Sequence, residues 1–195
     1  MHIAIDGLDG AGKTTAAREV ARRLGFSYVE KPLSAVSDPE GGLQEYLRFT
    51  SYINLHTDLE FRAMIYGAGT YLAALRARTE NIVSDRYICS MYAINATGEN
   101  ETFFDYLVET SGKPELTVVL FADAETRRLR IIRRDPQDPD LRRLKFSDDG
   151  YLRMRSFVDH FRVPCLWLDT TKMEPGEVAA AIIEYWTQLT IRVSG

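Results

Sequence analysis

Short apolar runs, separated by longer stretches with apolar residues at helical spacing, make up most of this chain. Three runs, at 2–6, 116–121 and 165–169, contain few polar residues, which is typical of parallel strands buried on both faces. Two more runs, at 27–30 and 81–85, predict further strands. The pattern therefore favours a sheet of five strands.

Helices are predicted between these strands. A helix at 13–24 follows the first strand, and apolar residues at 65–75 recur at helical spacing. A third helix is expected at 123–134, with an aspartate as N-cap and a proline shortly after its end. A last helix begins near Pro175, because proline is tolerated in the first helical turn. Its apolar stripe consists of Val178, Ile182, Trp186 and Leu189.

Strands that alternate with helices imply parallel βαβ units with helices on both faces of the sheet. We therefore expect an α/β protein with a three-layer α/β/α architecture and a five-stranded parallel sheet. A length of 195 residues fits a single domain spanning residues 1–195. The segments at 31–42 and about 135–150 are rich in polar residues, glycine and proline, and predict loops. The second is expected to form a mobile lid.

Composition narrows the classes of partner. The formal net charge of −4 does not suit a protein that coats nucleic acid. No signal peptide precedes the first motif, and no apolar run reaches the ~18 residues that span a bilayer. Cys89 and Cys165 stand in apolar contexts without C-x-x-C spacing, which favours reduced thiols in a cytoplasmic protein.

The sequence GLDGAGKT at 7–14 matches the phosphate-loop pattern G-x-x-x-x-G-K-[ST] between a predicted strand and a predicted helix. Its glycines allow backbone N–H groups to turn around phosphate oxygens at the positive end of the helix. Lys13 is expected to reach the β- and γ-phosphates of ATP, and the Thr14 hydroxyl to bind Mg²⁺. The expected ATP-binding residues are Gly7, Leu8, Asp9, Gly10, Ala11, Gly12, Lys13, Thr14 and Thr15. The alternative is an ordinary glycine-rich turn.

Asp85 and Arg86 end the third predicted strand, at the edge of the sheet where ligands bind in such folds. A carboxylate at this place suits Mg²⁺ opposite Thr14, and the arginine suits an acceptor phosphate. The alternative is an arginine in a surface ion pair.

Four stretches together resemble the thymidylate kinases and, more loosely, the deoxynucleoside kinases. They are IDGLDGAGKTT at 5–15, DRYICSMYAIN at 85–95, KPELT at 113–117 and LDTT at 168–171. They occur in the family's order over nearly the whole chain. The phosphate loop is specific only to a superfamily, whereas the D-R-Y stretch indicates this family. The resemblance implies a P-loop kinase fold, a homodimer, and the last stretch near the adenine of ATP.

The resemblance also assigns roles to single residues. It implies that Asp9 contacts the sugar 3′-hydroxyl of the acceptor, that Phe61 stacks on its base, and that Asn95 approaches that base. Asp85 would organise Mg²⁺, and Arg86 would bind the acceptor phosphate.

A catalytic arginine is expected in the lid, because the loop position that carries it in some family members is glycine here. An arginine delivered by lid closure stabilises the charge that develops on the transferred phosphoryl group. We favour Arg142 or Arg143 for this role, whereas Arg127, Arg128 and Arg130 are expected on a solvated helix face.

Three positions depart from the family pattern. Ile65 stands where a base-reading arginine is expected, and the nearby Arg62 should point to another side of the helix. Lys31 replaces a carboxylate after the second strand, and Asn95 is one methylene shorter than the family's glutamine. These three differences affect positions that would recognise a thymine base.

The sequence thus predicts ATP- and Mg²⁺-dependent phosphoryl transfer to a (deoxy)nucleoside monophosphate, giving the diphosphate. One alternative is a deoxynucleoside or other small-molecule kinase that phosphorylates a neutral hydroxyl. Another is a nucleotide-dependent switch, which needs a guanine-reading N-K-x-D stretch; TKME at 171–174 matches this poorly.

Overall fold

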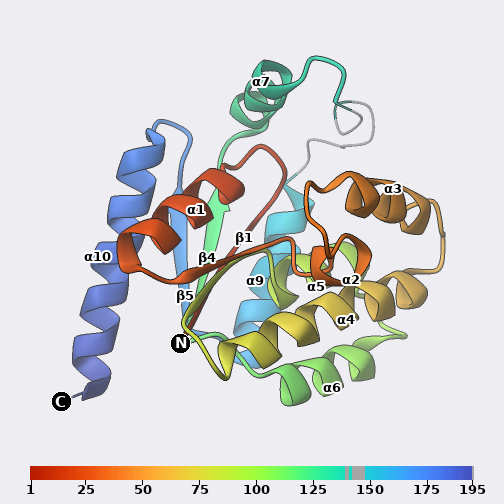
Figure 1. The fold of residues 1–195 in the computed structure, drawn as a ribbon, viewed down its shortest axis with the longest axis horizontal. Coiled ribbons are helices and arrows are strands. Elements are labelled where there is room, and N and C mark those ends of the chain that lie inside the picture. Colours follow the sequence, from red (N-terminus) through yellow and green to blue (C-terminus); the bar gives the residue numbers. More distant parts are fainter. Residues whose placement is uncertain (139–140, 142–147, 195) are drawn as a thin grey trace.

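A five-stranded, all-parallel sheet in the order β2-β3-β1-β4-β5 forms the centre of the computed structural model (Figure 1). The structure describes residues 1–138, 141 and 148–194. The strands are β1 (His2–Gly7), β2 (Ser27–Glu30), β3 (Ile82–Asp85), β4 (Leu116–Phe121) and β5 (Cys165–Asp169). β1 lies in the middle of the sheet, so the loop that follows it lies at the centre of the carboxyl edge.

Helices cover both faces of this sheet, with α1 and α10 on one side and α4, α5, α6 and α9 on the other (Figure 1). The helices before β4 are α1 (Lys13–Leu24), α2 (Ser34–Ser37), α3 (Gln44–Ile53), α4 (Leu59–Ala77), α5 (Ile88–Asn95) and α6 (Glu101–Ser111). Those after it are α7 (Ala124–Arg134), α9 (Asp149–Phe161) and α10 (Pro175–Ser194). Within the described residues, no helix has the length and apolar character needed to cross a membrane.

Two hydrophobic cores follow from the alternation of side chains along the strands. Ile3 and Ile5 of β1 pack with α1 and α10, and Ile182 of α10 is fully buried among them. Ala4 of the same strand packs in the other core, with α4, α5, α6 and α9. Since both faces are covered, a strand without polar alternation is what this sheet requires.

The predicted five-stranded parallel sheet and the α/β class are confirmed. The helices predicted at 13–24, 123–134 and from Pro175 are also present, with Asp123 accepting a hydrogen bond from Thr126 N as N-cap. The loop predicted at 31–42 is wrong at Ser34–Ser37, where one short helix forms.

Besides α2, the described helices α3, α5, α6 and α9 have no counterpart in the sequence analysis. α5 is buried around most of its circumference, so its sequence ICSMYAIN lacks the amphipathic period that reveals a surface helix. α6 and α9 each carry an apolar stripe, and these stripes were the signal that sequence reasoning missed.

Gly69 on α4 is required by the close approach of the chain that follows β2. A Cβ atom at this position would overlap the backbone of Leu33. Alanine in a helix interior normally gains about 1 kcal/mol over glycine, but overpacking of this kind costs about 1–3 kcal/mol. Because the overlap is with backbone atoms, we expect the upper part of this cost, so that Gly69→Ala lowers the free energy of unfolding by a net ~1–2 kcal/mol, measured by urea denaturation.

Gly98→Ala is the control for this measurement, because no atom lies within 4 Å of a Cβ built at that residue. A Gly69→Ala protein as stable as the wild type would mean that the segment after β2 is free to move away from α4.

Candidate functional site

The loop between β1 and α1 turns its backbone sharply around the N-terminus of α1. Gly12 adopts a φ of 93°, in the left-handed region that glycine tolerates best. Gly10 lies against α7, so closely that a Cβ atom there would stand 2.5 Å from the carbonyl oxygen of Arg127. No larger side chain fits at residue 10 without moving α7, which agrees with the glycine at this position in the sequence.

Lys13 is buried beneath the loop, with its side chain 6% exposed. Its Nζ donates a hydrogen bond of 2.7 Å to the carbonyl oxygen of Leu8 and lies 3.7 Å from Asp9 Oδ1. Burial, and then the charge of Arg86, lower the pKa of Lys13 to about 8, although Asp9 and other carboxylates oppose this shift. The ammonium group is thus held inside the loop by a backbone oxygen and a nearby carboxylate.

Thr14 and Asp85 meet across the site. The Thr14 hydroxyl donates a hydrogen bond of 2.5 Å to Asp85 Oδ2. The other carboxylate oxygen, Asp85 Oδ1, is buried and has no hydrogen-bond partner among the described residues. A hydroxyl beside an unpartnered carboxylate oxygen is a donor set that fits a hard divalent cation such as Mg²⁺.

Arg86 follows β3 in a left-handed conformation, with a φ of 80°. Its Nη1 donates to the carbonyl oxygen of Gly7 at 3.2 Å, and its Nη2 forms an ion pair with Asp9. Burial alone would raise the pKa of Asp9, but the charges of Arg86, then Lys13 and Arg134, outweigh it and hold the pKa at about 2. The guanidinium and the carboxylate therefore remain charged and bind the end of β3 to the phosphate loop.

The prediction of a solvated arginine face on α7 is wrong for two of its three residues. Arg127 is 1% exposed; its Nε donates to Ala122 O at 3.0 Å, and its Nη2 to Asp148 Oδ1 at 3.1 Å. Arg130 donates to both the hydroxyl and the carbonyl oxygen of Thr170. Arg128 is exposed, as expected. The prediction failed for Arg127 and Arg130 because α7 packs on the phosphate loop and on the segment after β5.

The Arg130–Thr170 contact joins two segments that surround the loop from the other side. The Thr170 hydroxyl also donates to Ala11 O at 3.1 Å, inside the phosphate loop. Sequence reasoning placed the LDTT stretch near the adenine of ATP but did not find its arginine partner. A helical arginine directed at a loop about 40 residues later leaves no local signal.

Aromatic side chains stand near Arg86 on the opposite side of the site. Tyr46 of α3 and Tyr66 of α4 both interact electrostatically with Arg86 and Asp9. Lys31, at the end of β2, places its Nζ 5.2 Å from the centroid of the Tyr46 ring. These contacts bring three elements of the chain around Arg86.

The residues expected to bind the acceptor base lie in different surroundings. Phe61 is half-buried at the start of α4, and its ring centroid lies 4.5 Å from that of His56. Arg62 interacts electrostatically with Tyr66, and its buried Nε has no hydrogen-bond partner among the described residues. Asn95 is 1% exposed and donates to Met91 O within its own helix. Arg142 and Arg143 lie outside the described residues.

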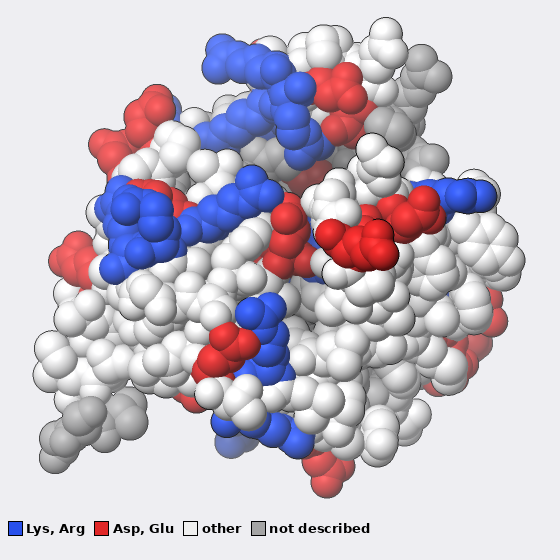
Figure 2. All heavy atoms as spheres, viewed as in Figure 1, with Lys and Arg blue, Asp and Glu red and all other residues white. Residues whose placement is uncertain are grey.

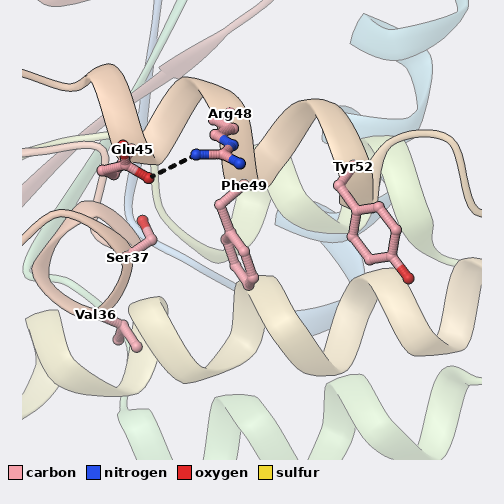
Figure 3. Close-up of a pocket in the computed structure, with 6 residues that line it drawn as sticks. All are labelled: Val36, Ser37, Glu45, Arg48, Phe49 and Tyr52. Carbon is pink, nitrogen blue, oxygen red and sulfur yellow. Dashed lines mark ion pairs between the residues drawn. The ribbon is translucent and has the colours of Figure 1, made fainter.

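Charged side chains gather around this site on one face of the molecule. In Figure 2, basic side chains over α1 and α7 flank a hollow in which acidic side chains lie. A cavity of about 400 Å³ extends from Thr14 and Thr15 along α1 to Pro175 and Gly176 of α10. A separate cavity of about 450 Å³ lies at α2 and α3, where Phe49 points from α3 toward α4 beside the Glu45–Arg48 ion pair (Figure 3).

Comparison with known proteins agrees with this geometry. The family model for thymidylate kinase matches residues 5–182. A probable thymidylate kinase of Methanocaldococcus jannaschii is 26% identical over 191 residues, which cover 95% of each chain. A second, from Thermoplasma acidophilum, is 30% identical over 155 residues, covering 71% of this chain and 74% of that protein.

Solved structures share the fold. The thymidylate kinase of Candida albicans has a TM-score of 0.70 at 17% identity, covering 96% of this chain and 91% of that one. The deoxyadenosine kinase of M. mycoides has a TM-score of 0.68 at 18% identity, covering 96% and 100%. The phosphate loop, Asp85 and Arg86 form one connected cluster, and the family model matches most of this chain. This chain therefore belongs to the thymidylate kinase family and is a kinase.

Proposed function

We propose that this protein transfers the γ-phosphoryl group of ATP, bound with Mg²⁺, to a nucleoside monophosphate and releases the nucleoside diphosphate. The observation that carries the proposal is the cluster of Lys13, Asp85 and Arg86 around the phosphate loop. Lys13 and Thr14 belong to the donor side of this cluster, and Arg86 to the acceptor side. Phosphoryl transfer depends mainly on positioning and electrostatic stabilisation, and these residues provide both.

On the donor side, the loop amides and Lys13 bind the triphosphate. Lys13 Nζ exchanges its hydrogen bond to Leu8 O for the β- and γ-phosphate oxygens. Thr14 Oγ1 and Asp85 would hold Mg²⁺, which would supply positive charge that neutralises the phosphates. The cavity beside Thr15 is proposed to hold part of the nucleoside of ATP, next to the segment that contains Thr170.

On the acceptor side, the charges favour a phosphate over a neutral hydroxyl. A hydroxyl needs a base to take its proton, whereas a phosphate oxygen is already ionised. Each carboxylate nearest the loop has an oxygen engaged: Asp6 Oδ1 with two backbone amides, Asp9 Oδ1 with Arg86, and Asp85 Oδ2 with Thr14. Lys31 adds a cation where relatives carry a carboxylate, near the Tyr46 ring. The cations suit an acceptor that arrives with negative charge.

The remaining acceptor contacts are proposed by family analogy and by placement. Asp9 takes the sugar 3′-hydroxyl, and Phe61 stacks on the base. Arg62, whose Nε is buried without a hydrogen-bond partner among the described residues, is the candidate donor to the base in place of the arginine that Ile65 replaces. Asn95 needs a different side-chain rotamer to reach the base, since its amide now bonds within α5.

The catalytic arginine is proposed to come from the lid, as Arg142 or Arg143. The close packing of Gly10 against the backbone of Arg127 supports this, because an arginine at residue 10 has no room. Arg134 at the end of α7 also interacts electrostatically with Asp9, so α7 directs positive charge toward the loop.

The protein is proposed to act as a cytoplasmic homodimer. Met64, Tyr71, Leu72 and Leu75 are all exposed and follow one another at helical spacing along α4, which gives an apolar stripe for a second copy. Cys89 and Cys165 are free, as expected in a reducing compartment. The acidic net charge of −4 argues against nucleic acid as a partner.

An acceptor panel tests the proposed reaction. With ATP and Mg²⁺, deoxynucleoside monophosphates should give ADP and the diphosphate, whereas the corresponding nucleosides should react at least about 100-fold more slowly in kcat/KM. ADP formation is followed by a coupled assay, and products by chromatography. Faster turnover of the nucleosides would instead establish the neutral-hydroxyl kinase.

Replacement of the phosphate-loop lysine should remove catalysis without unfolding the chain. We expect Lys13→Ala to lower kcat by about 10³-fold, because the charge that stabilises the transferred phosphoryl group is lost. Circular dichroism should be unchanged. Lys113→Ala, at an exposed lysine, is the control, and retained activity in Lys13→Ala would remove the central assignment.

Replacement of Arg86 should weaken the binding of the acceptor but not that of ATP. We expect Arg86→Ala to raise the acceptor KM by about 10- to 100-fold, as for the loss of a charged hydrogen bond, with little change in the KM for ATP. Steady-state kinetics with each substrate varied in turn measure both constants, and Arg128→Ala on the exposed face of α7 is the control. An unchanged acceptor KM would contradict the role of Arg86.

A further inference from the structure

The turn that presents Arg86 is strained and needs support from outside itself. Arg86 has a φ of 80°, which a side chain larger than glycine rarely adopts. Its backbone N–H is held by Ile5 O at 2.9 Å, and the next residues enter α5 directly. Any relaxation of this turn would swing the guanidinium away from Asp9 and Gly7.

α5 directly follows this turn, and its N-terminus has no side-chain cap of its own. Its N-cap residue is Tyr87, whose side chain makes no capping hydrogen bond. The first N–H groups of a helix have no partner within the helix and need an acceptor from elsewhere. The acceptor here comes from a different strand.

Asp6, the residue before the phosphate loop, supplies it. Asp6 Oδ1 accepts a hydrogen bond of 3.0 Å from Tyr87 N and another of 3.0 Å from Ser90 N. The residue is fully buried at the end of β1. Gly7 N donates in turn to Ser90 Oγ at 3.4 Å, so three hydrogen bonds join the end of β1 and the start of the loop to the start of α5.

Asp6 contacts the turn through Oδ1, whereas its Oδ2 is buried without a hydrogen-bond partner among the described residues. Its described hydrogen bonds go to the residues after Arg86, while the side chain of Arg86 bonds to Gly7 and Asp9. Burial raises the pKa of Asp6, an effect opposed by its hydrogen bonds to Ser90 and Tyr87. What the turn uses is an acceptor oxygen at a fixed place.

We propose that Asp6 is a positioning residue: by capping α5 across the sheet, it holds the β3–α5 turn so that Arg86 faces the acceptor phosphate. The inference rests on the proposed role of Arg86 in acceptor binding. Asp6 acts through Arg86 and takes no part in the transfer itself. Its loss should therefore impair acceptor binding while leaving the binding of ATP intact.

The test compares Asp6→Ala, which removes the acceptor oxygen, with Asp6→Asn, which keeps one. Asp6→Ala should raise the acceptor KM by about 10- to 100-fold, because small displacements of a binding group have effects of this size. In Asp6→Ala, the KM for ATP should stay within about twofold of the wild-type value. In Asp6→Asn, both KM values should stay within about threefold of the wild type. If the Asp6→Ala protein does not fold, the Asp6→Ser protein is measured in its place.

Two controls separate positioning from general loss of stability. Ile182→Ala opens a cavity in the core on the other face of the sheet, away from α5, and should leave both KM values unchanged. In the Arg86→Ala background, Asp6→Ala should add little to the acceptor KM, since the two residues act as one unit.

The inference is overturned if Asp6→Ala raises both KM values alike, if Asp6→Asn is impaired as strongly as Asp6→Ala, or if the effect persists without Arg86. Failure of the proposed function is distinguishable, because the wild type itself would then turn over no monophosphate. In that case, amide hydrogen exchange still decides: the Tyr87 and Ser90 amides should lose protection in Asp6→Ala, and retained protection would overturn the inference.

Discussion

The ion pair between Arg86 and Asp9 connects the two segments on which the site depends. Asp9 belongs to the phosphate loop and Arg86 to the end of β3, and in the sheet these strands are neighbours. The two opposite charges are partly buried, and their attraction holds Asp9 beside the end of β3. Lys13 and Thr14 then take their positions from the same loop, and Asp85 from the same strand end.

Under the proposed function, the surroundings of this pair divide into a donor side and an acceptor side. The donor side is built from backbone groups and from residues of the phosphate loop, which leave little scope for change. The proposed acceptor side consists of side chains of α3 and α4 and of Lys31, which departs from the family pattern. Lys31 and Arg62 place positive charge near Tyr46 and Tyr66, respectively. Specificity can thus vary while the phosphoryl-transfer machinery is retained.

Much of the fold was predictable from local pattern. Strands buried on both faces are apolar runs, and α1, α7 and α10 carry clear start or stop signals, so their positions agree with the structure. α5 escaped prediction because a helix buried on nearly all sides has no polar face to reveal its period. Arg127 was misjudged for a related reason: its burial against Ala122 and Asp148 depends on α9, far along the chain.

The sequence by itself determined the phosphate loop, the Asp85-Arg86 pair and the α/β architecture, because each is encoded in contiguous residues or in a short period. Only the tertiary structure decided that Arg130 holds Thr170, that Gly10 packs on α7, and that Asp6 caps α5. These contacts join residues that are distant in the chain and meet at the carboxyl edge of one sheet. Their geometry depends on strand order and helix packing, which no single stretch of sequence specifies.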